Sequence, residues 1–260
     1  ICTEIDVIIH AAGMNARECE LDPVAALKFN GLATARLLMA SIRTRVKRFI
    51  YLSTAHVYSS PLTGIISEDS YPRNLHPYAS SHLAGESAVT AANQRGEIKG
   101  IVIRLSNVFG APAHKDVNCW KLLVNDICLQ AVETGTIILH TTGIQERDFI
   151  SMRGVAQAVG HLTFYDSNNL LPRVYNVGSG ESQSVFKVAQ LVQQRCKVIL
   201  GFEPKIQRPE IIGDHKNESL EYRSDRLGKI GLKIEFDSSS EIDSLLEFCR
   251  VMSNHDQIDE

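Results

Sequence analysis

Two groups of polar and aromatic side chains could act on one small molecule. Ser53 and Thr54 end an apolar run that is typical of a buried strand. About twenty residues further on, Pro77 opens a predicted helix that carries Tyr78 and His82. These two residues are four apart, so they project from one face of the helix. A phenol and an imidazole facing a hydroxyl-bearing strand end are suited to proton transfer.

The elements that position these side chains alternate between strands and helices. Apolar runs predict strands over 5–9, 46–53 and 100–105, and capping signals and periodicity predict helices over 23–41 and 78–94. Consecutive parallel strands joined by helices make right-handed crossovers. The first half of the chain therefore predicts an α/β fold with a doubly wound parallel sheet.

The second half of the chain is more mixed, which predicts a smaller lobe covering one end of the sheet. Its pattern predicts a loop over 143–150 that carries Arg147, and a strand over 174–177. That strand ends in a Gly-Ser-Gly turn at 178–180. Helices are predicted on either side of this turn and at the carboxyl end.

Composition excludes several classes of function. The 260 residues are 44% hydrophobic and 22% charged, with a net charge of −3 and scattered basic residues, so no nucleic acid partner is expected. No apolar run reaches the ~18 residues of a membrane helix, and no signal peptide precedes the first strand; we expect a cytoplasmic protein without a membrane partner. The six cysteines have no ligand spacing, so neither a disulfide framework nor a metal site is expected.

Several short motifs make the chain similar to a known family. They are His10-Ala-Ala-Gly13, Asn30, Leu-Ser-Thr-x-x-Val-Tyr at 52–58, Tyr78-x-x-x-His82 with Gly85-Glu86, Arg104-Leu-Ser-Asn107 with Gly110, Arg147-Asp-Phe-Ile150, Tyr175-Asn-Val-Gly-Ser-Gly180 and Arg208-Pro209. In this order they resemble the extended short-chain dehydrogenase/reductases, specifically the NAD-dependent nucleotide-sugar epimerases and dehydratases. The resemblance covers almost the whole chain and implies a Rossmann-type sheet.

The resemblance implies catalytic roles for two residues. Thr54 stands where the family places the Ser or Thr that hydrogen-bonds the sugar hydroxyl to be oxidised. Tyr78 stands at the general base that removes the proton of that hydroxyl. A free phenol titrates near ~10, so a tyrosine base at neutral pH needs a neighbouring positive charge.

The resemblance also implies ligands and their binding residues. The cofactor is NAD, with NADP left open, and the residues placed beside it are Ala11, Ala12, Gly13, Ser53, Tyr78 and His82. The substrate is a nucleotide sugar, and the residues placed beside it are Asn107, Arg147 and Arg208. The family further implies a homodimer, with the helices that begin at Pro23 and at Pro77 as the contact.

The chain departs from the family at His82, where the family has lysine. Lysine supplies a permanent charge that lowers the tyrosine pKa and holds the ribose of the cofactor. A histidine with an ordinary pKa near ~6.5 is only partly charged at neutral pH. The expectation is chemistry that weakens as His82 loses its proton, with hydrogen bonding to the ribose as its remaining role.

A second departure is the lack of a Gly-x-x-Gly-x-x-Gly phosphate loop in the sequence. We expect a preceding segment that carries this loop, and we expect the chain alone to be weak or inactive. Residues 1–110 are then the remainder of the dinucleotide-binding domain, and 111–260 form the substrate lobe, with about 137–177 returning to the sheet. The glycines at 178 and 180 are interpreted as a plain turn.

The residues after Thr54 bear on the reaction. Dehydratases and decarboxylating members of the family carry acidic residues there, whereas this chain has Ala55 and His56. Epimerisation through a transient 4-keto sugar is therefore the first hypothesis. The alternatives are a nucleotide-sugar dehydrogenase or reductase, a nucleotide-sugar or NAD-binding protein that has kept the fold and lost activity, and a fragment without independent function.

Overall fold

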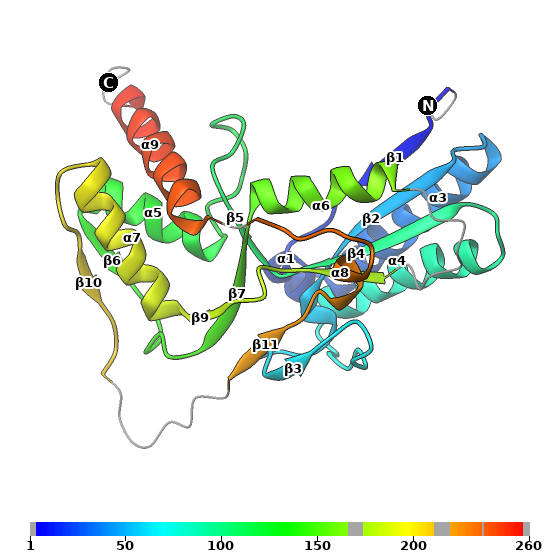
Figure 1. The fold of residues 1–260 in the computed structure, drawn as a ribbon, viewed down its shortest axis with the longest axis horizontal. Helices are drawn as coiled ribbons and strands as arrows, with labels where there is room; N and C mark the ends of the chain where they lie inside the picture. The colour runs from blue at the N-terminus through cyan, green and yellow to red at the C-terminus, as the bar shows by residue number, and fades with distance from the viewer. Residues whose placement is uncertain (1–3, 166–173, 211–218, 236, 257–260) are drawn as a thin grey trace. The chain divides into compact units, whose positions relative to one another are not determined.

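A computed structural model of the chain describes residues 4–165, 174–210, 219–235 and 237–256. Its contacts divide the chain into two units. The first comprises Ile1–Ser106, Gln157–Val177 and Arg223–Lys233, and the second comprises Asn107–Ala156, Gly178–Tyr222 and Ile234–Glu260. Each unit is described here by itself (Figure 1).

The first unit is built on a four-stranded parallel sheet. In spatial order its strands are β1 (Val7–His10), β2 (Arg48–Thr54), β4 (Lys99–Leu105) and β8 (Val174–Val177). The central strands are apolar and buried on both faces, as expected where helices cover a parallel sheet. This sheet confirms the predicted fold class. Because all four strands run in one direction, their carboxyl ends meet at one edge, where Thr54 lies.

A nearly continuous helical run connects β1 to β2. Its parts are α1 (Ala16–Leu21), α2 (Pro23–Ala26), the π-helix η1 (Leu27–Ala33) and α3 (Thr34–Arg43). The sequence predicted one helix from residue 23, and it missed α1, which begins with a capping box between Asn15 and Glu18. Asp22 caps the amide of Ala25, as its position before Pro23 predicted.

Helix α4 (Pro77–Gln94) has the predicted bounds and packs closely on this run. A side chain at Gly31 would place its Cβ 3.2 Å from the Cβ of Ala84 on α4. Gly31 therefore lets η1 and α4 approach each other closely. This explains why a glycine, which disfavours regular helix, stands inside this helical run. Below α4, Phe49, Tyr51 and Val102 form the core between helix and sheet.

The remaining elements of the first unit are short or shared with the second. They are the 3-10 helix η2 (Ala55–Val57), β3 (Gly64–Ile66), α8 (Asp225–Lys229) and the later part of α6 (Met152–Phe164). Figure 1 shows α6 on the opposite side of the sheet from α3 and α4. The guanidinium of Arg48 on β2 donates to the backbone oxygens of Leu162, Thr163 and Tyr165 at the end of α6.

The second unit packs helices on short strands. Strand β7 (Glu146–Ser151) pairs in parallel with β5 (Asn107–Phe109) and antiparallel with β9 (Ser182–Ser184), while β6 (Thr136–Ile138) pairs with β10 (Lys205–Gln207). Its helices are α5 (Leu123–Thr134), α7 (Val185–Ile199) and α9 (Ser238–Asp256), and β11 (Leu220–Tyr222) also belongs to it. These helices enclose a core that includes Ile127, Val192 and Leu245.

One predicted element of the second unit is wrong. The loop expected over 143–150 is largely strand β7, because Phe149 and Ile150 are buried and the backbone pairs with β5 on one side and with β9 on the other. Polar residues at 145–148 hid this strand from the sequence pattern. Among the described residues, no helix is long and apolar enough to cross a membrane.

Candidate functional site

Thr54 and Tyr78 come together at the carboxyl edge of the sheet in the first unit. Thr54 ends β2 in an extended conformation, and its side-chain oxygen accepts a hydrogen bond from the amide of His56 at 3.1 Å. Tyr78 is the second residue of α4, where the His76 ring accepts from its amide at 3.2 Å. A hydrogen bond from the Thr54 side chain lowers the pKa of the Tyr78 phenol, but burial has the larger effect and raises it.

His82 lies one turn along α4 from Tyr78. The two rings meet edge to face, with their centroids 4.7 Å apart. The imidazole is 6% exposed, and its Nδ1 lies 2.9 Å from the hydroxyl of Tyr51. Burial, followed by repulsion from His10, lowers the pKa of His82 to about 4.

This pKa corrects the expectation that His82 is partly charged at neutral pH. A buried imidazole without a carboxylate beside it loses its proton well below pH 6. Within the described residues, the Thr54 hydrogen bond is the only contribution that lowers the pKa of Tyr78. His82 is therefore a neutral hydrogen-bonding group across pH 6–8, and it does not supply the charge that a lysine would supply.

Ser53 belongs to a buried polar network behind the strand end. Its hydroxyl donates to Oε1 of Glu86 at 2.5 Å. Glu86 also accepts a bidentate pair of hydrogen bonds from Arg104, whose guanidinium lies over the ring of Tyr58. Because its proton is used by Glu86, Ser53 contributes to holding the end of β2 in place.

The small residues 11–13 follow β1 and are exposed. A Cβ on Gly13 would lie 3.4 Å from Oδ1 of Asn30 and 3.6 Å from the ring of His82, so this backbone runs beside the His82 imidazole. Asn30 is fully buried in η1, accepts from the amide of Met14 and donates to the hydroxyl of Ser81. It joins the loop after β1 to α4.

Two residues of this site carried no predicted role. Asn30 was noted only as part of a motif, although a buried amide in a helix requires partners. Tyr51 was taken as part of an apolar strand, although a buried tyrosine hydroxyl generally finds a hydrogen-bond partner. Both signals are present in the sequence, but neither names the partner.

The comparison with known families covers the first two thirds of the chain. Residues 1–178 match the NAD dependent epimerase/dehydratase family. The chain belongs to this family. Among curated members it is 26% identical over 252 residues to dTDP-D-glucose 4,6-dehydratase of Bos taurus, covering 95% of this chain and 68% of that protein. It is 27% identical over 212 residues to the uncharacterized UDP-glucose epimerase YtcB of Bacillus subtilis, covering 78% of this chain and 63% of that protein.

The chain thus spans about two thirds of the length of these curated family members. Solved structures share the fold. UDP-glucuronic acid 4-epimerase from Bacillus cereus, in complex with UDP-glucuronic acid and NAD, has a TM-score of 0.78 and 20% identity, covering 96% of this chain and 76% of that one. The Thermus thermophilus UDP-glucose 4-epimerase complex with NAD has a TM-score of 0.77 and 23% identity, covering 95% of this chain and 78% of that one.

In this member of the epimerase/dehydratase family, the three predicted substrate residues lie in the second unit. Asn107 on β5 donates its amide to the backbone oxygen of Asp148 at 2.9 Å, which ties β5 to β7. Arg208 donates to the backbone oxygen of Thr142, and its guanidinium lies 3.5 Å from the ring centroid of Phe186.

Arg147 on β7 is partly buried, and its side chain has no hydrogen bond or ion pair with any residue in the described ranges. Burial lowers the pKa of its guanidinium, and no carboxylate in the part of the chain that the structure describes offsets this. A half-buried guanidinium without an anionic partner is unfavourable by itself.

The turn at 178–180 is organised around Asp148. The carboxylate accepts from the amides of Ser179 and Gly180 at 2.9 and 2.8 Å, and from the Ser179 hydroxyl at 2.9 Å. A Cβ on Gly178 would come within 2.6 Å of this carboxylate. The amides of this turn thus already bind a carboxylate of the same chain.

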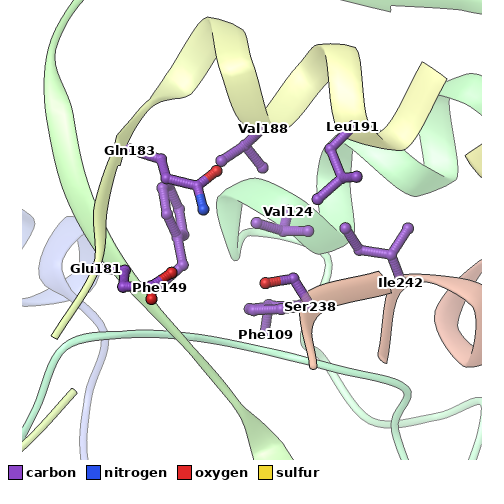
Figure 2. Close-up of a pocket in the computed structure, with 9 residues that line it drawn as sticks. All are labelled: Phe109, Val124, Phe149, Glu181, Gln183, Val188, Leu191, Ser238 and Ile242. Carbon is purple, nitrogen blue, oxygen red and sulfur yellow. The ribbon is translucent and has the colours of Figure 1, made fainter. Parts of the chain in front are cut away.

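The second unit also contains a small cavity (Figure 2). It is lined mainly by apolar side chains, with three polar residues at its margin: Phe109, Val124, Phe149, Glu181, Gln183, Val188, Leu191, Ser238 and Ile242. Its volume of about 10 Å³ has room for one water molecule at most. It is too small for a sugar or a nucleotide.

No group of three His, Cys, Asp or Glu side chains in the described part of the chain could hold a metal ion. The cysteines there are free: Cys119 is partly exposed, while Cys19, Cys128, Cys196 and Cys249 are buried. They pack as small apolar residues. The sixth cysteine, Cys2, lies outside the described residues.

Proposed function

We propose that this chain carries the proton-transfer site of an NAD-dependent nucleotide-sugar epimerase, which acts through a transient 4-keto sugar. The observation that supports this most directly is that the Thr54 side chain lies close enough to the Tyr78 phenol, at the carboxyl edge of the sheet, to lower the pKa of that phenol. Two hydroxyls that converge in this way can both contact one sugar hydroxyl. Ala55 and His56, which follow Thr54, offer no carboxylate for a dehydration.

Each residue has a defined task in this proposal. Thr54 orients the sugar hydroxyl, and Tyr78 accepts its proton and later returns that proton to the same oxygen, while the hydride that left the ring carbon comes back to either face of that carbon. NAD, when bound, supplies the acceptor and donor of hydride. The exposed backbone of Ala11, Ala12 and Gly13 has no bulky side chain to keep the cofactor away, and His82 lies beside Gly13.

The nucleotide end of the substrate is assigned to the arginines. Arg147 is partly buried without a partner among the described residues, which favours a phosphate contact. Arg208 is oriented by Phe186 and by the Thr142 oxygen, and a guanidinium with several donors has others left for a phosphate. Asn107 already donates to Asp148, so we give it a supporting role.

A second candidate is a protein that binds NAD and a nucleotide sugar without turnover. The observation that favours it is the neutral His82, whose pKa of about 4 leaves Tyr78 without a neighbouring cation among the described residues. A phenol with a raised pKa is almost wholly protonated at neutral pH, so it is poorly suited to accept a proton. The remaining source of positive charge is the oxidised nicotinamide ring of the bound cofactor.

We also propose a homodimer through α3 and α4. A shallow groove between these helices is lined by Ala35, Leu38, Met39, Ile42, Arg43, Ala88, Ala91, Ala92, Arg95 and Glu97. Small side chains on α4 allow a helix of a second copy to approach closely, and the charged residues lie at one end. Sedimentation of the wild type and of Ala91→Arg tests this: the variant should be monomeric.

The experiment for the epimerase proposal combines binding and turnover. NAD affinity is measured by calorimetry, and interconversion is followed across a panel of UDP and dTDP sugars. Tyr78→Phe should lower turnover at least ~100-fold, as expected for loss of a general base, while NAD binding changes little. Thr54→Val should lower turnover ~10-fold or more. Tyr71→Phe, at an exposed position, is the matched control.

The two candidates predict different results. Turnover that survives Tyr78→Phe unchanged would contradict the epimerase proposal. Tight binding of NAD by the wild type, without turnover of any sugar in the panel, would favour the binding protein.

A further inference from the structure

Tyr51 makes one well-formed hydrogen bond in the core of the first unit, and it makes it to His82. The phenol oxygen lies 2.9 Å from Nδ1, and the two rings are nearly parallel with centroids 5.9 Å apart. The Tyr51 ring also stacks on His10, with the ring centroids 5.6 Å apart. His82 is thus held from below the helix by a ring fixed in the sheet.

The fit of Tyr51 under α4 depends on a glycine. A Cβ on Gly85 would lie 2.8 Å from the Tyr51 oxygen and 2.9 Å from the carbon that bears it. Gly85 is three residues after His82, so it occupies the adjacent position on the same face of α4. The space left by its missing side chain is what lets the Tyr51 hydroxyl reach Nδ1.

The surrounding hydrogen bonds indicate which atom donates. Thr34 donates its proton to the backbone oxygen of Asn30 at 2.6 Å, so its oxygen accepts from Nε2 of His10 at 2.9 Å. Thr34 also lies within reach of the Tyr51 hydroxyl. An imidazole nitrogen is a stronger acceptor than a hydroxyl that already accepts one hydrogen bond. The Tyr51 proton is therefore directed to Nδ1 of His82.

We propose that Tyr51 is a positioning residue that donates to Nδ1 of His82 and so holds it in the Nε2–H tautomer, with a neutral N–H donor beside Gly13. This deepens, and rests on, the proposed NAD-dependent function. In a neutral histidine one nitrogen accepts and the other donates, so a donor at Nδ1 leaves the proton on Nε2. A neutral N–H suits a ligand hydroxyl oxygen, such as that of a ribose.

Several titratable groups surround His82 in the described structure. They are His10 on β1, Tyr51 on β2 and Tyr78 on α4 itself, and further out Glu86, which acts on Tyr51, and Cys19, which acts on Tyr78. Burial raises the pKa of Tyr51, so its proton is present throughout the accessible pH range. A hydrogen bond donated by Tyr51 to the neutral form of His82 lowers the pKa of His82 further, in addition to the effect of burial.

The test reads the tautomer directly. Protein labelled with ¹⁵N-histidine is examined at pH 7 by long-range ¹H–¹⁵N correlation without NAD, and the His82 signals are identified by their loss in His82→Gln. We expect a protonated Nε2 and a bare, hydrogen-bonded Nδ1. In Tyr51→Phe, which keeps the ring, the Nδ1 signal should move to that of a free nitrogen and the pKa of His82 should rise.

Binding gives a second readout. Tyr51→Phe should weaken NAD about five- to tenfold, the effect of one misplaced hydrogen bond. A protonated Nδ1 in the wild type overturns the proposal, and this result does not depend on the folding of Tyr51→Phe. Unchanged Nδ1 shift and pKa in a folded Tyr51→Phe also overturn it. Failure of the wild type to bind NAD refutes the proposed function instead, because the tautomer is measured without cofactor.

Discussion

Arg104 and Glu86 form a bidentate ion pair in the interior of the first unit. Nη2 of Arg104 lies 2.6 Å from Oε2 of Glu86, Nε lies 3.1 Å from Oε1, and both side chains are less than 10% exposed. The same carboxylate accepts the Ser53 hydroxyl, one residue before Thr54. Helix α4, strand β4 and the end of β2 are thus joined at one carboxylate directly behind the proposed site.

Breaking this pair should destabilise the protein strongly. In Glu86→Gln the buried guanidinium of Arg104 loses the carboxylate of its ion pair, and removal of one partner of a buried pair generally costs about 3 to 5 kcal/mol. Urea unfolding followed by circular dichroism measures the loss. Glu97→Gln is the control, because Arg95 and Glu97 form an ion pair of similar geometry at the surface. It should leave the midpoint unchanged, and equal effects of the two variants would contradict the argument.

The low pKa of His82 predicts that stability falls on acidification. The unfolded chain binds a proton near pH 6.5, whereas folded His82 does so only near pH 4. Between these values the unfolded state holds more protons, so the free energy of unfolding decreases as pH falls, by about 3 kcal/mol in total. Above pH 6.5 this contribution is constant. Urea unfolding at a series of pH values measures the slope.

His82→Gln should remove most of this slope between pH 6.5 and 4. A smaller slope remains from His10, whose pKa burial also lowers. His114→Gln is the matched control, since that side chain is exposed. A slope that persists in full in folded His82→Gln would show that His82 is not the group responsible.

His82→Lys should strengthen the base at the proposed site. A lysine ammonium one turn from Tyr78 favours the phenolate and lowers the pKa of Tyr78. The rise of kcat/KM with pH should shift toward lower pH, and turnover at pH 7 should increase at least ~10-fold. Ser87→Lys, on an exposed position of the same helix, is the control. An unchanged pH profile in His82→Lys would argue that Tyr78 is not the base.

Gly85→Ala should destabilise the protein through Tyr51. The added methyl group would lie 2.8 Å from the Tyr51 oxygen, and overpacking of this kind generally costs about 1 to 3 kcal/mol. Gly160→Ala in α6 is the matched control, because its Cβ meets open space and alanine is the better helix former. Thermal unfolding should show opposite signs for the two variants, and a stabilised Gly85→Ala would refute the packing argument.

Local sequence patterns were sufficient for much of the fold and for the elements that carry the candidate site. The Asp22-Pro23 cap, the Pro77 start of α4 and the apolar strands depend on interactions within a few residues, so their bounds were predicted closely. Strand β7 was missed because its pairing partners are distant in sequence, and α1 was missed because it is a single short turn with polar residues.

The sequence by itself determined that Thr54 ends a parallel strand, that Tyr78 and His82 share a helix face, and that histidine replaces the lysine of the family. These facts follow from periodicity, spacing and motif. Only the tertiary structure decided the charge of His82 and the partners of Ser53, Tyr51 and Asp148. A pKa and a hydrogen bond depend on burial and on atoms brought together from distant segments, and no local pattern contains them.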